Sequence, residues 1–250
     1  MKKILFVLVL TVFVLSACGT ASTPVPVPTN TPIPPPTETP IPPTATLEPS
    51  PTPDPLLFQD DFEGSLGDGW QWVRENKKYW SLTNNAGWLE IMARSGHVGN
   101  GDIDNLLLRQ VPEGNFELET QLKFKPTGNF QIAGLLIYES AANFIQFGRA
   151  FCGTTYCIRD GYYLDSTGNG NFNPENFATT APEADTIFLR LRREGNTFTA
   201  YASEDGKEWK LIGAHNNQMN PLFVGLVSGQ AYGTVPQPAQ FNYFTITALP

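Results

Sequence analysis

The sequence predicts an all-β fold, an antiparallel sandwich of two packed sheets, preceded by a tether without fixed structure. Beyond residue 55, apolar and polar residues alternate with the period of two that is typical of half-buried strands, as in Phe116–Phe124 and Ile187–Arg192. Turn sequences rich in Gly, Asn and Asp separate these runs, and no stretch shows sustained helical spacing. In contrast, residues 19–55 hold 14 of the 22 prolines.

Residues 1–18 predict an export signal with a lipid attachment site. Two lysines precede an apolar run from Ile4 to Leu15, which would be about 18 Å long as a helix, too short for a hydrocarbon core of about 30 Å. A charged start and a short apolar middle are typical of a signal peptide. Leu15–Cys18 (Leu-Ser-Ala-Cys) resembles the bacterial lipobox, whose cysteine carries the lipid; an ordinary cleavage site is the alternative. We expect Cys18 to anchor the chain to the membrane outside the cytoplasm.

The segment 19–55 is predicted to be a semi-rigid linker. From Thr20 to Pro55 the sequence has 14 prolines and nine threonines, and no aromatic residue. Such a composition cannot bury enough apolar surface to offset the entropy of ordering, and proline favours the extended polyproline II conformation. Residues 56–250 follow without any further linker and are predicted to form one domain.

Composition excludes several partners and cofactors. The chain carries 24 acidic and 16 basic side chains, a net charge of −8, so it lacks the basic surface that binds phosphate backbones, and we expect no nucleic acid partner. Two histidines and three cysteines exclude the common multi-ligand zinc sites. We therefore expect no cofactor, with calcium as the one candidate metal.

The order of motifs after residue 56 carries a family resemblance. Asp-Asp-Phe at 60–62 opens the domain, Gly-Trp-Leu-Glu-Ile at 87–91 forms an early strand, and Ser-Glu-Asp-Gly-Lys-Glu-Trp at 203–209 forms a late turn. In this order the set resembles the concanavalin A-like domain at the C-terminus of family 43 β-xylosidases and arabinofuranosidases. The resemblance implies a jelly-roll sandwich with one concave sheet, and the catalytic propeller of those enzymes is absent here.

Cys152 and Cys157 are predicted to form a disulfide. They flank a short Gly-Thr-Thr-Tyr loop, and paired cysteines outside the cytoplasm favour a disulfide. A metal pair is the alternative, but His97 and His215 are remote in the sequence.

Evidence for catalysis in the sequence is weak. Glu117 and Glu119 project from the same face of one strand, about 7 Å apart, which would suit a glycosidase pair. The alternative is that acidic residues on the outer face of an amphipathic strand have no special role. No Gly-x-Ser-x-Gly elbow is present. We expect the protein not to be an enzyme.

A calcium ion often lies where the first and last strands of concanavalin-like sandwiches meet. The resemblance therefore makes Asp60, Asp61 and Asn242 candidate calcium ligands, because carboxylate and amide oxygens suit this ion. The loop Gly101–Asn105 is a second acidic candidate. For both, a solvated turn is the alternative.

Six residues are candidates for binding a glycan. Aromatic rings stack on sugars and planar polar groups bond to hydroxyls, although large sandwiches also use aromatic residues for packing. The candidates are Trp88, Tyr138, Gln146, Arg149, Tyr162 and Tyr163. The long polar segment Asp165–Phe177 could also contribute to binding.

The predicted function is that of a lipid-anchored cell-surface protein with a non-catalytic domain that binds a xylan-like polysaccharide or another glycan. A protein-interaction or structural domain of the cell envelope is the first alternative, and a glycoside hydrolase is the second. The fold class alone supports the glycan function only by association.

Overall fold

The computed structural model describes residues 55–155, 157–173, 177–229, 233 and 235–250. The chain divides into two units, Met1–Ser50 and Pro51–Pro250. The predicted signal peptide, the lipid attachment at Cys18 and the predicted linker up to residue 54 lie outside the described residues. Within the described part of the chain, no helix is long and apolar enough to cross a membrane.

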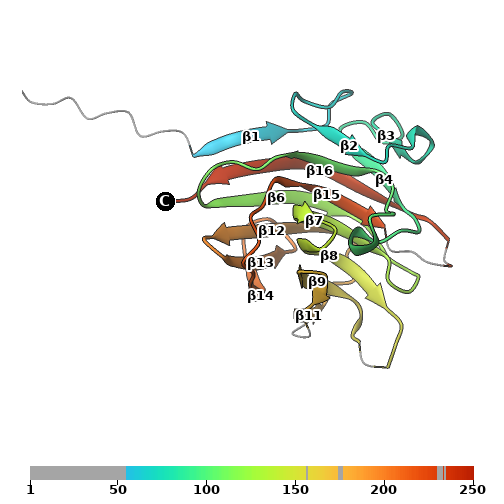
Figure 1. The fold of residues 1–250 in the computed structure, drawn as a ribbon. Coiled ribbons are helices and arrows are strands. Elements are labelled where there is room, and N and C mark those ends of the chain that lie inside the picture. The colour runs from blue at the N-terminus through green and yellow to red at the C-terminus, as the bar shows by residue number, and fades with distance from the viewer. Residues whose placement is uncertain (1–54, 156, 174–176, 230–232, 234) are drawn as a thin grey trace, which may run out of the picture. The chain divides into compact units, whose positions relative to one another are not determined.

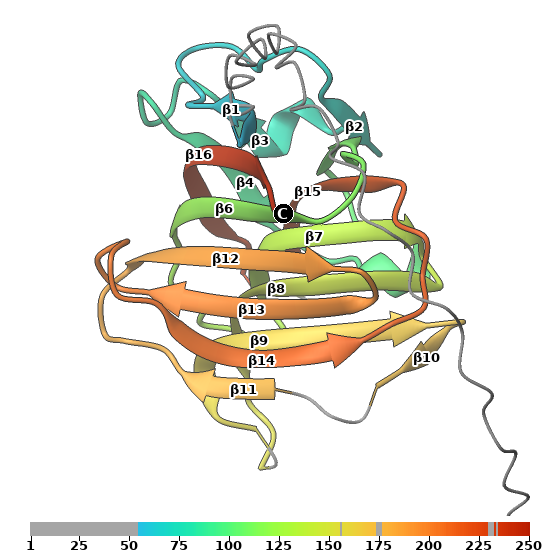
Figure 2. The same ribbon diagram turned by 90° about the vertical axis from the view of Figure 1, so that its left-hand side faces the viewer.

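The described domain consists of two antiparallel sheets of eight strands each (Figures 1 and 2). Sheet A has the order β14 (Lys210–Asn216), β13 (Thr197–Ser203), β12 (Thr186–Glu194), β6 (Phe116–Lys123), β16 (Gln237–Ala248), β4 (Leu89–Ala93) and β3 (Trp80–Ser81), and β1 (Leu56–Asp60) pairs with β16. Sheet B has the order β10 (Asn171–Phe172), β9 (Arg159–Gly168), β8 (Asn143–Cys152), β7 (Ile132–Ser140), β15 (Phe223–Gly229), β5 (Leu106–Gln110) and β2 (Gln71–Val73), and β11 (Phe177–Thr180) pairs with β9.

The predicted fold class is confirmed. Besides the strands, the described residues contain only two short 3-10 helices, η1 (Lys77–Tyr79) and η2 (Val98–Asn100). The period-two runs became strands because each run offers one apolar face. In β6, for example, Phe116, Leu118 and Leu122 are buried in the core between the sheets.

The core between the sheets is large and rich in aromatic residues. Phe116, Phe147, Phe198, Phe241 and Phe244 have no exposed surface. Burying one such side chain stabilises the fold by roughly 1.5–3 kcal/mol, and truncating one to alanine would cost about 3–5 kcal/mol. The core is therefore sufficient to hold the two sheets together.

A second, smaller apolar cluster lies on the outer face of sheet B. Val98 and Ile103, from the segment between β4 and β5, pack there against side chains of the sheet, namely Leu106, Leu108, Leu136, Phe144 and Val227. A side chain at Gly229 would collide with Ile103, so this glycine allows the segment to lie close to the sheet. Because residues 94–105 cover this part of the face, the opening that remains lies over β8 and β9.

Candidate functional site

The opening on the outer face of sheet B is a pocket of about 290 Å³, here called the sheet B pocket. Its wall and floor come from loops and from strands β7, β8, β9 and β10. The lining residues are His97, Phe130, Ile132, Ala150, Phe151, Cys152, Cys157, Tyr163, Asp165 and Phe172.

Asp165 is the carboxylate of the pocket lining, and the buried Gln146 on the neighbouring strand bonds to it. Gln146 on β8 and Asp165 on β9 are register partners, and the Gln146 amide Nε2 donates a hydrogen bond of 2.9 Å to Asp165 Oδ2. Burial raises the pKa of Asp165 to about 6, although the hydrogen bond from Gln146 acts in the opposite direction. The pocket thus holds a carboxylate that is ionised at neutral pH and poorly solvated.

His97 reaches the pocket from the segment that covers sheet B. Its Nδ1 accepts a hydrogen bond of 2.9 Å from the backbone N–H of Gly99, which leaves the proton of the neutral ring on Nε2. Burial lowers the pKa of His97, and the nearby Asp102 raises it by a smaller amount. His97 is therefore a neutral hydrogen-bond donor at pH 7.

The acidic loop Gly101–Asn105 supports this arrangement. The carboxylate of Asp102 accepts a hydrogen bond of 2.7 Å from the backbone N–H of His97. Asp104 forms salt bridges with Arg74 (3.5 Å) and Arg94 (3.0 Å). These carboxylates are thus bound to protein groups that hold the covering segment in place.

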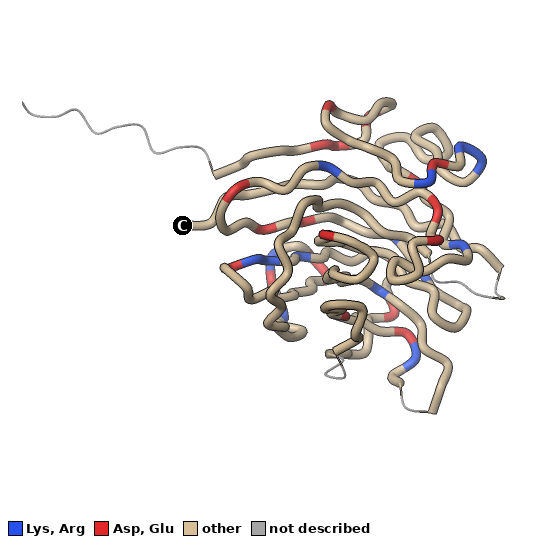
Figure 3. The backbone as a smooth tube through the Cα atoms, viewed as in Figure 1, with Lys and Arg blue, Asp and Glu red and all other residues tan. Residues whose placement is uncertain are grey.

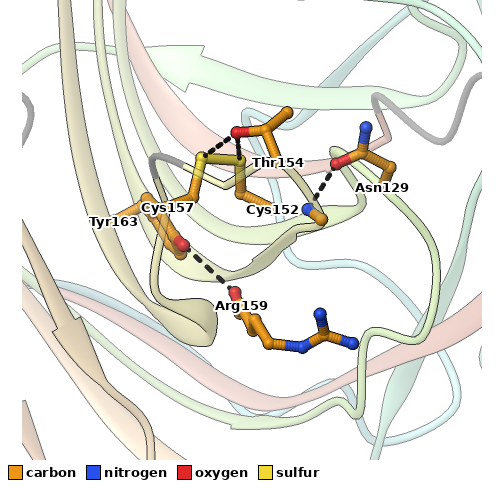
Figure 4. The surroundings of a disulfide bond; sticks show 7 residues. Asn129, Cys152, Thr154, Cys157, Arg159 and Tyr163 are labelled. Carbon is orange, nitrogen blue, oxygen red and sulfur yellow. Dashed lines mark hydrogen bonds between the residues drawn. A yellow bond between two sulfur atoms is a disulfide. The ribbon is translucent and has the colours of Figure 1, made fainter.

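The predicted disulfide between Cys152 and Cys157 is confirmed, and it forms part of the pocket wall (Figure 4). The Thr154 hydroxyl lies 3.0 Å from the Cys157 sulfur. On the adjoining strand, Tyr163 packs against Cys152, and its hydroxyl donates a hydrogen bond of 3.0 Å to the backbone oxygen of Arg159 (Figure 4). The bridge and the tyrosine together make this side of the pocket rigid.

Two phenylalanines give the pocket exposed aromatic surface. Phe130 is 46% exposed and Phe172 is 54% exposed, although the other phenylalanines of the domain mostly lie in its core. Exposed aromatic rings next to hydrogen-bonding groups are suited to a ligand with both apolar and polar faces.

The structure brings some of the predicted glycan-binding residues together at this face. Tyr163 lines the sheet B pocket, and Gln146 lies behind the lining and bonds to Asp165, which does line it. Tyr138 is partly buried against the apolar cluster on the same face of the sheet. Trp88 immediately precedes β4 of sheet A, out of phase with the buried Leu89 and Ile91, so it belongs to the opposite outer face of the sandwich.

Arg149 and Tyr162, two further predicted glycan-binding residues, lie away from the sheet B pocket. Arg149 has no exposed surface and forms a bidentate pair with Asp160 at 2.7 and 2.8 Å. Tyr162 belongs to the core between the sheets, and burial raises its pKa to about 12. Arg149 also donates a hydrogen bond to the backbone oxygen of Pro182 at 3.0 Å, so its role in this structure is to fix the chain before β12.

The predicted calcium ligands are already engaged in other contacts. The Asp60 carboxylate accepts hydrogen bonds from the N–H groups of Phe62 (2.9 Å), Gly67 (2.7 Å) and Trp70 (2.8 Å). Three N–H groups directed at one carboxylate oppose a cation there. The side chain of Asp61 accepts from Gln59, and the Asn242 amide donates to the Gly87 oxygen. Among the described residues, no three His, Cys, Asp or Glu side chains form a metal cluster, so these residues do not fit a calcium site.

Glu117 and Glu119 do project from one face of β6, but arginines on β12 bind both of them. Arg192 contacts Glu117 at 2.8 Å, and Arg190 contacts Glu119 at 2.6 Å and Glu117 at 3.0 Å. The Tyr243 hydroxyl donates a further hydrogen bond of 2.6 Å to Glu119. With their oxygens engaged in this way, the pair is structural, as the alternative interpretation held.

Sequence reasoning did not single out the pocket residues His97 and Phe130, and it noted Asp165 and Phe172 only as members of the polar segment Asp165–Phe177. The missed signal was the pair Val98 and Ile103, two apolar residues in a loop-like segment. Apolar side chains in such a segment indicate that it packs onto the domain. That packing is what brings His97 to the sheet.

Known proteins agree with this architecture. A family model described as the β-xylosidase C-terminal concanavalin A-like domain matches residues 59–247. No curated protein sequence matches the chain.

Among solved structures, the GH43 protein BlXynB from Bacillus licheniformis is similar, with a TM-score of 0.69 and 20% identity over 76% of this chain and 39% of that one. The xylan β-1,4-xylosidase from Bacillus halodurans C-125 gives a TM-score of 0.65 and 21% identity over 76% of this chain and 38% of that one. A β-glucanase from Bacillus licheniformis gives a TM-score of 0.53 and 14% identity over 77% of this chain and 98% of that one.

At these identities the structural similarity shows the fold alone. The chain spans less than half the length of the two GH43 proteins. The family model, in contrast, covers most of the chain, and the resemblance noted in the sequence is confirmed. The chain belongs to the family of β-xylosidase C-terminal concanavalin A-like domains.

Proposed function

We propose that this protein is a non-catalytic glycan-binding protein and that the sheet B pocket is its binding site. The observation that carries the proposal is the combination in one pocket of the Asp165 carboxylate, which Gln146 holds by a hydrogen bond, with the exposed rings of Phe130 and Phe172. A sugar presents C–H faces to aromatic rings and hydroxyls to polar groups, which is the pattern of surfaces found here.

The polar groups of the pocket suit hydroxyl groups in particular. The Asp165 carboxylate accepts hydrogen bonds, and charge-assisted bonds of this kind are about twice as strong as neutral ones. His97 supplies a donor, since its Nδ1 is already occupied by the Gly99 N–H. A sugar hydroxyl can donate a hydrogen bond to the Asp165 carboxylate and accept one from His97 Nε2.

The lining of the pocket favours binding over hydrolysis. Asp165 is the single carboxylate among its described lining residues, whereas most glycosidases use a pair. The matched family model describes the C-terminal domain of β-xylosidases. A xylan-like polysaccharide is the first ligand to test, because β-xylosidases act on such chains and this domain accompanies them.

A glycan array with the purified full chain, followed by calorimetry with linear xylo-oligosaccharides, tests the proposal. Phe130→Ala should weaken binding by about tenfold, since loss of a stacked ring costs on the order of 1 kcal/mol or more. Leu222→Ala removes an equally exposed apolar side chain (47%) elsewhere on the surface and is the matched control. If no glycan binds and a protein of the envelope is captured instead, the domain is a protein-interaction domain of the cell envelope. Released reducing sugar would establish a glycoside hydrolase.

We also propose that the chain is lipid-anchored through Cys18 and that residues 19–55 hold the domain away from the membrane. The support is the sequence pattern described above, with a short apolar run before Leu-Ser-Ala-Cys. Cys18→Ala should move the protein from the membrane fraction to the soluble fraction. Unchanged membrane association would refute the anchor without affecting the binding proposal.

A further inference from the structure

A second cavity, of about 460 Å³, lies at the ends of strands β8, β9 and β14. On β9 it is lined by Ser166 and Gly168, which are in phase with the core residue Leu164, whereas Tyr163 and Asp165 of the sheet B pocket lie on the other face of the strand. It is called here the amide pocket, because eight of its lining residues are Asn or Gln, among them Asn143, Asn171, Asn216 and Asn220. Residues of β10 and of the end of β14 line this cavity, and Figure 2 shows these two segments near each other. The function proposed above does not use it.

The amide pocket is built from side chains whose positions are fixed by bonds to the backbone. Asn143 Oδ1 accepts a hydrogen bond of 2.7 Å from the N–H of Asn169, and Asn171 Nδ2 donates to the Asn169 oxygen at 3.2 Å. The backbone N–H of Asn220 donates to Glu139 Oε2 at 2.9 Å. A cavity wall held in this way is preorganised, which lowers the entropic cost of binding.

Amide side chains are matched to hydroxyl groups. Each one offers two N–H donors and an acceptor oxygen, and a sugar hydroxyl both donates and accepts. With so many amides around one cavity, a ligand that carries several hydroxyls can form several such bonds at once. An apolar ligand would displace water from these polar groups without replacing its hydrogen bonds, which is costly.

Phe172 connects the two cavities, because it lines both of them. It lies on β10, opposite Thr167 of β9, with more than half of its side chain exposed. Taken alone, the sheet B pocket is at the lower edge of the range of about 300–1,000 Å³ for small-molecule sites. Phe172 is thus the residue at which the two linings meet, at the edge of sheet B.

The charge of the two linings selects against acidic ligands. Their described residues include no Lys or Arg, whereas Glu139 lies in the amide pocket and Asp165 in the sheet B pocket. A uronic acid unit at either position would be repelled by a carboxylate and would find no cation to pair with.

We propose that the sheet B pocket and the amide pocket bind consecutive units of one neutral glycan chain, with Phe172 as the ring shared between them. This inference rests on the proposed glycan-binding function and specifies its ligand as an uncharged oligosaccharide longer than a single unit. Each cavity then contributes to affinity only when the chain is long enough to reach it.

Calorimetry of the full chain with xylose and with linear xylo-oligosaccharides from the disaccharide to the hexasaccharide tests the inference. Affinity should rise at least tenfold along this series. The double variant Asn171→Ala/Asn220→Ala should abolish the rise and reduce the affinity for the longer sugars to that for xylose, since both residues belong to the amide pocket alone. Leu211→Ala, an exposed site on β14, is the control variant, and thermal melting checks that all variants are folded.

The outcomes separate this inference from the function on which it rests. Binding that is the same for every length, or a rise with length that survives in the double variant, overturns the shared site but leaves glycan binding intact. Equal affinity for a glucuronic acid-substituted xylo-oligosaccharide of the same length overturns the selection for neutral chains. No binding at any length overturns the proposed function and the inference together.

Discussion

The outer faces of the two sheets use their polar residues in opposite ways. On sheet A, Glu117 and Glu119 of β6 are paired with Arg190 and Arg192 of β12 at 2.6–3.0 Å. The guanidinium carbon of Arg190 also lies 3.7 Å from the ring centroid of Trp209. Figure 3 shows charges of both signs mixed along the domain. The charges of this face thus satisfy one another.

On sheet B, the outer face is mostly apolar and is covered by residues 94–105. Where the cover ends, Asp165, bonded to the buried Gln146, lines a cavity that the exposed Phe130 and Phe172 also line. Burial of the Asp165 carboxylate raises the free energy of its ionised form, and this raises its pKa to about 6.

This contrast makes the outer face of sheet B the candidate binding surface of the domain. A ladder of ion pairs on an exposed sheet face contributes modestly to stability, and its groups are not available to a ligand. A poorly solvated carboxylate destabilises the free protein. When a ligand binds beside it, the carboxylate gains hydrogen bonds from the ligand, so such a group is a candidate for a functional site. The following predictions test this contrast, starting with the largest expected effect.

Asp165→Asn should stabilise the domain at high pH and not at low pH. The folded-state pKa of about 6 lies above the ordinary value of 3.8, so ionisation opposes folding as pH rises from about 4 through 6. A shift of about two pKa units corresponds to at most about 3 kcal/mol. Urea unfolding at pH 8 and pH 4 measures this gain, and an equal gain at both values would contradict the account.

Cys152→Ser/Cys157→Ser should lower stability by about 2 kcal/mol, as expected for opening a short closed loop. It should also weaken glycan binding, because both cysteines line the sheet B pocket. Thermal melting with and without reductant measures the first effect. A variant that melts like the parent under non-reducing conditions would show that the bridge does not stabilise the domain.

Glu119→Gln should cost about 1 kcal/mol, because it weakens bonds to Arg190 and Tyr243 on a partly exposed face. Glycan affinity should remain that of the parent, since the side chain belongs to sheet A. Chemical unfolding and calorimetry on one preparation compare the two quantities. A loss of glycan affinity in Glu119→Gln would show that sheet A takes part in binding and would contradict a site on sheet B.

Trp88→Ala is expected to have the smallest effect on binding. Trp88 lies on the sheet A side of the sandwich, next to β4, and was a glycan-binding candidate from its sequence alone. Affinity for a xylo-oligosaccharide should be unchanged within error. A tenfold loss would restore Trp88 as a binding residue and remove the distinction between the two faces.

The fold could be predicted from the sequence because alternation reports directly which face of a strand is buried. The same alternation places Arg149 in phase with Phe147, and Tyr162 in phase with Leu164, which puts both inside the sandwich. These two candidates were chosen by residue type, although their phase already opposed them. The disulfide was predictable since its two cysteines are close in the sequence.

The pocket could not be predicted in the same way because it depends on contacts between distant segments. His97 reaches β9 only because Val98 and Ile103 pack on sheet B, and Phe172 stays exposed because β10 lies at the edge of that sheet. Periodicity assigns a side chain to a face, but it does not say which part of that face a loop will cover.

We expect the glycan to bind on the sheet B side of the sandwich. Backbone amide chemical shifts of the isotope-labelled protein show directly which face the ligand contacts. Titration with a linear xylo-oligosaccharide should shift the amide signals of Tyr163, Asp165 and Phe172. The signals of Glu117 and Arg190 on sheet A should stay in place. Shifts confined to sheet A, with the signals around Asp165 unchanged, would contradict the account.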